Sequence, residues 1–267
     1  MFIKRSKTKI LITGFIVLCA VLLSTVPANA VDIGGETIGI TTDFTYASKY
    51  LWHGYDILDD RTAFQPSVTV DYKGFFAGVW GSWPGSSGFE DLTEIDLFTG
   101  YGRNFFEEDW YALDAWISYT YFIYPKINND VDAQELGLGF SMPNLIPLGE
   151  SALIPHYAMY YDWAGVQSSD KVDNGWFQTW GLTYSLPIPA LIPTQEEQSL
   201  DLSWDITYND GVFGSDSGWS HSTLGISSTF EWRNLYFTPS VNYQSSFEDS
   251  VNDEDELYAL FSIGIVF

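Results

Sequence analysis

Apolar and polar residues alternate along most of this chain. Between Leu200 and Tyr208 an apolar or aromatic residue stands at every second position, and Asp201, Ser203 and Asp205 stand between them. Successive side chains of an extended strand point to opposite faces, so this segment is predicted to be a strand with one apolar and one polar face.

The same pattern recurs in twelve segments separated by Gly, Pro, Asn and Asp. Each is close to the roughly 9–11 residues with which a tilted strand crosses a bilayer. The segments are 37–46, 64–72, 74–83, 93–103, 110–122, 134–142, 152–161, 176–186, 199–208, 222–232, 235–244 and 257–267.

The polar faces of these segments are unusual for a soluble protein. They consist of Gly, Ser, Thr, Asn and Asp with almost no Lys, whereas a soluble sandwich normally turns Lys, Arg and Glu to water. Such faces suit a confined wet lumen, and a closed barrel leaves no backbone unpaired in hydrocarbon. The sequence therefore predicts an all-β fold, a transmembrane antiparallel up-and-down β-barrel of about twelve strands.

Aromatic residues on the apolar faces gather near the predicted strand ends. This is the arrangement of the two girdles that lie at the headgroup level of a barrel. They are Tyr46, Tyr72, Tyr101, Tyr119, Tyr121, Tyr161, Trp176, Tyr184, Tyr208, Trp232, Tyr243 and Phe267.

The first thirty residues have the composition of a cleaved secretory signal peptide. Basic residues precede an apolar stretch, and the small residues Ala28 to Ala30 follow it; an uncleaved membrane anchor is the alternative. We therefore assign 1–30 to the signal and 31–267 to the barrel. The signal also holds Cys19, the only cysteine, so the remaining chain has neither a disulfide nor a cysteine metal site.

The net negative charge of the chain argues against nucleic acid as a partner. The chain carries a net charge of −24, and without the four basic residues of the signal the remainder carries −28. Such a chain repels nucleic acid and attracts cations. Aromatic residues make up 18 % of the sequence, which excludes disorder as the explanation of this acidity.

Further specificity comes from the first predicted hairpins. Residues 41–83 and 94–106 resemble the TorF-like group of bacterial outer-membrane porins, a family of conserved hypothetical barrel proteins. The resemblance implies an outer-membrane barrel with solute passage, although His53 stands where Arg is commoner in that family. The matching positions are Ser48, Lys49, Tyr50, Trp52, Gly54, Phe75, Phe76, Ala77, Gly78, Val79, Trp80, Glu94, Ile95, Asp96, Gly100 and Tyr101.

Acidic residues on the inward parity are the candidate site. Charge of one sign along a lumen selects ions of the other sign, so we predict a channel for passive, cation-preferring passage of small hydrophilic solutes. One alternative is a structural or adhesive barrel with a plugged lumen, in which the acids only form hydrogen bonds within the wall. Inward Phe98, Trp116 and Tyr160 would narrow such a lumen. The other alternative is a lipid hydrolase. The predicted pore-lining residues are Asp43, Asp71, Glu94, Asp96, Asp114, Asp201 and Asp205.

Other site classes have weaker support. The histidines His53, His156 and His221 lie in no recognisable hydrolase motif, so we predict no catalytic residues, no cofactor and no dedicated metal site. The acidic run 252–256 is predicted to be a solvated outer loop in which divalent cations bridge to lipopolysaccharide phosphates. Phe267 resembles the terminal signal that the barrel-assembly machinery reads in bacterial outer-membrane proteins.

Overall fold

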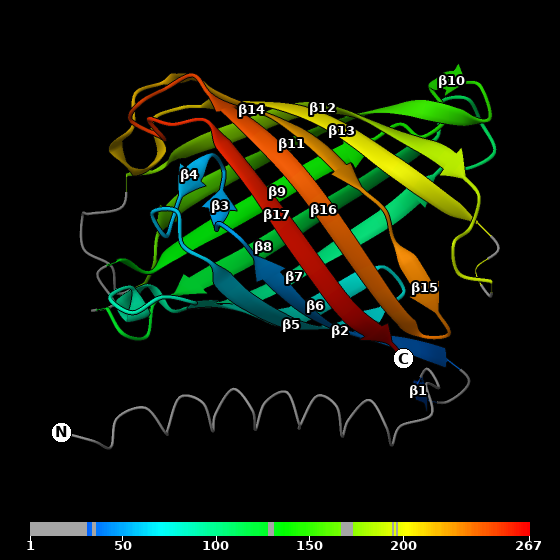
Figure 1. The fold of residues 1–267 in the computed structure, drawn as a ribbon, viewed down its shortest axis with the longest axis horizontal. Coiled ribbons are helices and arrows are strands. Elements are labelled where there is room, and N and C mark those ends of the chain that lie inside the picture. Colours follow the sequence, from blue (N-terminus) through cyan, green and yellow to red (C-terminus); the bar gives the residue numbers. More distant parts are fainter. Residues whose placement is uncertain (1–30, 34–35, 128–130, 167–172, 194, 196) are drawn as a thin grey trace.

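The structure, a computed structural model, describes residues 31–33, 36–127, 131–166, 173–193, 195 and 197–267. Across these residues twelve long strands form one closed antiparallel barrel (Figure 1). They are β2 (Glu36–Ala47), β5 (Ala63–Tyr72), β6 (Phe75–Pro84), β7 (Glu94–Phe105), β8 (Leu113–Ile123), β9 (Ala133–Ser141), β11 (Ser151–Ala164), β12 (Gly175–Ile188), β13 (Gln198–Asn209), β14 (Gly218–Ser227), β16 (Leu235–Ser246) and β17 (Glu256–Val266).

Each strand pairs with its neighbours along the chain, and the last strand closes the wall on the first. The seam between β17 and β2 runs from Leu260 opposite Ala47 to Val266 opposite Thr41. Phe267 extends it, because its backbone N–H donates to the Ile40 carbonyl at 2.8 Å. Closure removes the unpaired edges that an open sheet would carry.

The connections define two ends of the barrel. Among the described residues, the loop end holds 48–62, 85–93, 124–127, 131–132, 165–166, 173–174, 210–217 and 247–255; the turn end holds 73–74, 106–112, 142–150, 189–193, 195, 197 and 228–234. Short elements lie within or beside these connections. They are β1 (Val31–Ile33), β3 (Leu51–Trp52), β4 (Tyr55–Asp56), β10 (Ile146–Leu148), β15 (Phe230–Trp232) and the 3₁₀ turns η1 (Glu90–Leu92) and η3 (Val212–Gly214).

The predicted all-β barrel of about twelve strands is confirmed, with two differences in the strands. The segment 110–122 begins only at Leu113, because residues 106–112 form turns closed by backbone hydrogen bonds. The segment 222–232 is divided into β14 and β15. Opposite the break stands Pro239, which accepts from the Ser228 N–H at 3.4 Å but has no N–H to return.

The two faces of the wall differ in the way the alternation predicts. Outward residues such as Val79, Leu97 and Leu224 are about half exposed, at 46 %, 48 % and 55 %. Inward positions carry smaller or polar side chains, and the small ones leave room for rings: a Cβ on Gly139 would lie 2.7 Å from the Trp116 ring. The wall thus presents a continuous apolar surface outside and a polar one inside.

The predicted signal peptide over 1–30 lies outside the described residues. Among the residues that are described, no helix is both long enough and apolar enough to cross a membrane.

Candidate functional site

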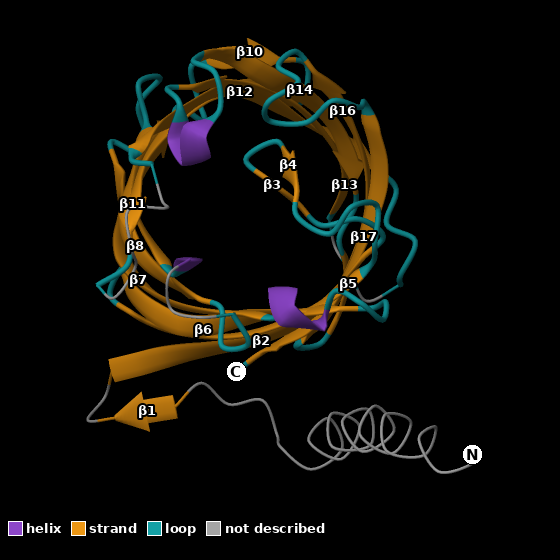
Figure 2. Cartoon of the chain, turned by 90° about the vertical axis from the view of Figure 1, so that its left-hand side faces the viewer, coloured by secondary structure: helices purple, strands orange, loops and turns teal. Residues whose placement is uncertain are grey.

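The first connection of the loop end folds into the barrel. Figure 2 shows β3 and β4 inside the ring of wall strands. We call residues 48–62, which contain this two-stranded hairpin, the plug. The first two predicted strands, 37–46 and 64–72, leave this segment as a connection between them. Its large apolar residues Leu51, Trp52, Ile57 and Leu58 are the sequence signal that distinguishes it from the more polar loops.

Aromatic contacts hold the tip of the plug against the wall. The Trp52 ring lies 5.5 Å from Phe122, 5.7 Å from Phe177 and 5.6 Å from Phe213. The His53 ring stacks on Phe177 with centroids 4.3 Å apart and an interplanar angle of 13°. Phe177 is completely buried, so these rings form a closely packed apolar contact between the plug and this side of the barrel.

Hydrogen bonds fix the plug to several strands. The Tyr50 hydroxyl donates to Glu94 on β7 at 2.9 Å, and His53 Nε2 lies 3.0 Å from Glu135 on β9. On the other side of the barrel, Gln244 on β16 donates to the Gly54 carbonyl at 2.8 Å. The plug therefore spans the lumen from β7 and β9 to β16.

Gly54 is required at the turn of this hairpin. Its φ of 96° lies in the region that side chains rarely adopt, and a Cβ there would stand 2.4 Å from His221 Nδ1. The backbone of the plug therefore packs directly against the wall at β14.

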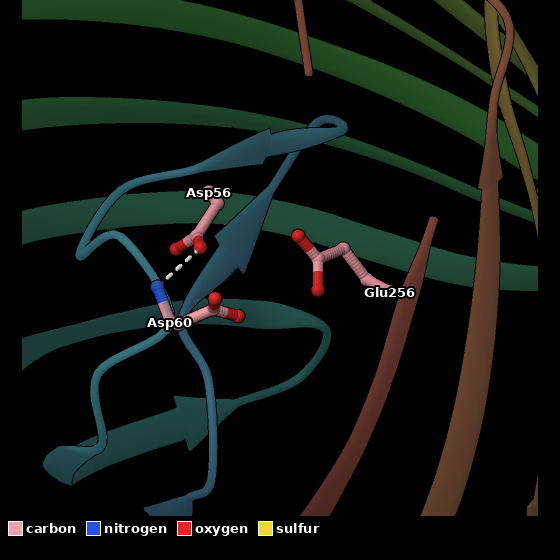
Figure 3. A group of neighbouring side chains, drawn as sticks. All are labelled: Asp56, Asp60 and Glu256. Atoms are coloured by element: carbon pink, nitrogen blue, oxygen red, sulfur yellow. Dashed lines mark hydrogen bonds between the residues drawn. The ribbon is translucent and has the colours of Figure 1, made fainter. Parts of the chain in front are cut away.

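Lys49 anchors the base of the plug through ion pairs with Asp60 and Glu256. Figure 3 shows these two carboxylates together with that of Asp56. The Lys49 ammonium donates to Glu256 at 2.5 Å. Burial lowers the pKa of Lys49, but its hydrogen bonds to Asp60 and Glu256 and their charges outweigh this effect, so the pKa lies above its ordinary value.

The carboxylates around Lys49 have the spacing of metal ligands. Oxygen atoms of Asp56, Asp60 and Glu256 all lie within 4.8 Å of one another. Asp56 is turned toward its own hairpin, where it accepts from the N–H groups of Leu58 and Asp60. Because Lys49 already supplies a cation to the other two, we interpret the group as an internal ion-pair network.

Three of the predicted pore-lining acids lie apart from the plug. Asp43 accepts from the Tyr236 hydroxyl at 2.8 Å. Asp71 covers Gly39, where a Cβ would lie 1.8 Å from its Oδ2. Asp114 has a long contact with the Ser141 hydroxyl, at 3.5 Å. These acids occupy the lumen wall toward the turn end.

On β13, Asp201 and Asp205 also take polar partners. Asp201 accepts from the Ser199 hydroxyl at 2.7 Å, and Asp205 Oδ1 lies 2.6 Å from His156 Nε2. Asp205 thus pairs with a histidine, a group that can carry a positive charge. Its side chain and that of His156 remain about a quarter to a third exposed.

Glu94 and Asp96, the remaining two, belong to a buried acidic group. Glu94 accepts from the hydroxyls of Tyr50 and Tyr124, both at 2.9 Å. Asp96 is within electrostatic range of Glu94 and Glu135, and Glu135 stands directly opposite Asp162 in the register of β9 and β11. Sequence analysis missed Asp162 because the predicted strand ended one residue earlier, although its parity is inward.

The predicted narrowing residues contribute rings to the lumen. Trp116 and Tyr160 have centroids 5.8 Å apart, and Tyr160 also contacts the His53 ring at 4.7 Å. Phe98 pairs with Phe76 at 6.4 Å. Wall rings and plug therefore meet at His53.

Sequence comparison identifies a family. Residues 34–179 match the model of a family described as bacterial protein of unknown function (Gcw_chp). The match covers the plug and the wall from β2 into β12, but it does not support the TorF-like name. No curated protein matches the sequence.

Solved structures with the same fold are outer-membrane barrels. A KdgM porin aligns with a TM-score of 0.51 at 9 % identity, over 85 % of this chain and 99 % of its own. A NanC porin gives 0.52 at 6 % identity, over 85 % and 98 %. An outer membrane channel of the COG4313 group from Pseudomonas putida F1 gives 0.50 at 11 % identity, over 91 % and 100 %. At such identities the similarity establishes the fold alone.

Proposed function

This chain belongs to the Gcw_chp family of bacterial proteins of unknown function, and from its barrel we propose that it is a porin-like channel of the bacterial outer membrane. The solutes would be small, hydrophilic and preferentially cationic, and they would move passively. The observation that carries this proposal is a closed twelve-stranded wall that is apolar outside and acidic inside. The likeness in fold to the KdgM and NanC porins supports it.

The plug modifies this proposal. It crosses the lumen near the loop end, so passage requires that it move or that solutes pass beside it. A barrel with a permanently closed lumen and a structural or adhesive role is therefore the second candidate. Conductance of the purified protein in planar bilayers distinguishes the two, because a closed barrel gives no channel events at any salt concentration.

Cation preference has its own test. Replacing Asp71, Asp114 and Asp201 with Asn removes three lumen charges that lie outside the plug contacts. We expect the reversal potential in a salt gradient to shift toward anions, and the shift to shrink as salt rises, since the Debye length falls to about 3 Å at 1 M.

A matched control removes three charges from a loop instead. Asp249, Asp253 and Glu254 are exposed in 247–255, and their amide variants should leave selectivity unchanged. Equal shifts in the two triple variants would mean that the lumen acids do not set the preference.

We also propose a non-catalytic role. The one Ser–His contact among the described hydrogen bonds joins Ser220 Oγ to His221 Nδ1 at 2.9 Å. Ser220 is completely buried in the wall and also donates to the Thr207 carbonyl, so its hydroxyl is not available to a lipid ester. Lipid hydrolysis by the purified barrel would overturn this part of the proposal.

The partners follow from the proposed location. The acidic loop end would face lipopolysaccharide, with divalent cations bridging 252–256 to its phosphates, and Phe267 at the seam would be the residue that the assembly machinery reads. Both remain predictions, and the second is tested below.

A further inference from the structure

Two buried carboxylates of the wall near the plug have unsatisfied oxygen atoms. The side chain of Asp162 is 0 % exposed, and neither of its oxygens has a hydrogen-bond partner among the described residues. Asp96 is 7 % exposed, and its Oδ1 is also without a partner there. Buried polar atoms are nearly always hydrogen-bonded, so two unsatisfied acids in one region of the wall require an explanation.

These acids do not stand alone. Asp162 lies directly opposite Glu135 in the strand register, and inward side chains at such positions have Cβ atoms about 4.5–5.5 Å apart. Glu135 is 6 % exposed, and its charge acts on both Asp162 and Asp96. Glu94, at 2 % exposed, is the fourth member. The four come from β7, β9 and β11 and face the lumen.

Positive charge around this group is scarce. His53 from the plug lies against Glu135, and Tyr50 and Tyr124 donate neutral hydroxyls to Glu94. Taking several ionised carboxylates out of water without compensating cations costs several kcal/mol for each ion. A bound cation would offset this cost and give the free oxygens of Asp162 a ligand.

We propose that Asp162 and Glu135 bind a divalent metal cation, and that Asp96 and Glu94 contribute to it only through their charge. Hard carboxylate oxygens select Ca²⁺ or Mg²⁺. Ca²⁺ suits the group better, because it accepts six to eight oxygens in irregular geometry, whereas Mg²⁺ demands a near-ideal octahedron. Asp162 and Glu135 would hold the ion directly, and water would complete its coordination.

This proposal does not depend on conduction, because the site also forms in a barrel whose lumen stays closed. It differs from the ion-pair network around Lys49, where the protein provides its own cation. Because Asp162 is completely buried, an ion bound during folding would be enclosed by the protein.

For the test, the full barrel is refolded in detergent with either about 2 mM CaCl₂ or EDTA. This Ca²⁺ concentration saturates a site whose dissociation constant is about 10⁻⁴ M or lower. The midpoint of thermal unfolding is read from heat-modifiable migration on gels. The wild type should unfold at a higher temperature with Ca²⁺ than with EDTA, and MgCl₂ should give a smaller rise.

The Asp162→Asn variant tests which carboxylate binds the ion. In EDTA the variant should be more stable than the wild type, because an unpaired buried charge has been removed, and it should show no response to Ca²⁺. Calorimetric titration of Ca²⁺ into the Lys49→Met protein, whose plug is unseated more often, should lose at least tenfold in affinity when Asp162→Asn is added. Glu135→Gln provides a second variant if Asp162→Asn does not fold.

Asp253→Asn, an exposed loop acid, is the matched control and should keep the wild-type response. The proposal is overturned if Ca²⁺ does not stabilise the wild type, or if Asp162→Asn responds as the wild type does. A response lost in Asp253→Asn instead would place the ion on the loops.

Discussion

Lys49 allows a quantitative test of how firmly the plug is seated. Replacing it with Met keeps most of the side-chain volume and removes the charge that pairs with Asp60 and Glu256. The Glu256 side chain is 3 % exposed, so its carboxylate would be left buried among other acids. Lys49 itself is 24 % exposed and Asp60 is 46 % exposed, which weakens the effect.

The free-energy cost of unseating the plug by Lys49→Met can be estimated from these exposed fractions. Breaking a fully buried ion pair costs about 3–5 kcal/mol, and an exposed pair contributes about 0–1 kcal/mol. A value of about 2 kcal/mol lies between these limits. Since each 1.4 kcal/mol is a factor of ten, the ratio of unseated to seated plug should rise roughly 30-fold.

Single-channel recording in planar bilayers measures this ratio as open time divided by closed time, which for a rarely open channel is close to the open fraction. Lys49→Met should raise it about 30-fold relative to the wild type. Lys126→Met, an exposed lysine in another connection of the loop end, is the control and should leave it unchanged. Adding Glu256→Gln to Lys49→Met should recover part of the seating, because the stranded charge is removed.

An open fraction in Lys49→Met that stays within threefold of the wild type would refute the reasoning. An equal rise of the open fraction in Lys126→Met would also refute it, because the effect would then come from the loss of any positive charge in the loops.

Three further changes test other parts of the molecule. Gly54→Ala places a methyl group against His221 at a φ of 96°, so it should unseat the plug and raise the open fraction, whereas Gly88→Ala, with φ 99° but open space around it, should not. Phe267→Asp should reduce the amount of folded protein in the outer membrane. It should change the stability of barrel refolded in detergent little, because the backbone hydrogen bonds to Ile40 remain. Equal losses in both measurements would exclude a signal role. Leu97→Arg puts a charge on the outward face and should cost about 2–4 kcal/mol in urea unfolding in lipid, against a small effect for Leu97→Ile; a neutral result would mean that this face does not meet hydrocarbon.

The wall could be predicted from the sequence because its determinant is local. A strand with one apolar and one polar face has a period of two, and every wall strand displays it, so the strands were found within a few residues of their bounds. Even the break at Pro239 has a local cause, although it acts on the partner strand and is invisible within 222–232.

The plug could not be predicted in this way. Its partners Glu135, Gln244 and Glu256 lie 82 to 207 residues away in sequence, and nothing in 48–62 specifies them. The inward parity did identify Glu94 and Asp96, but parity says only that a side chain faces the lumen. Which acids meet, and that Asp162 joins them, depends on the stagger between β7, β9 and β11.

The position of Glu256 at the start of β17 has a consequence for the order in which the molecule folds. The same strand carries the seam with β2 and the carboxylate that holds Lys49. Bringing chain segments more than two hundred residues apart together has a loop-closure entropy cost, and here one closure event supplies both contacts. Until β17 docks, the barrel has two open edges and the plug lacks its main ion pair. Closing the wall therefore also completes the contacts of the plug, and an incomplete barrel holds the plug less firmly.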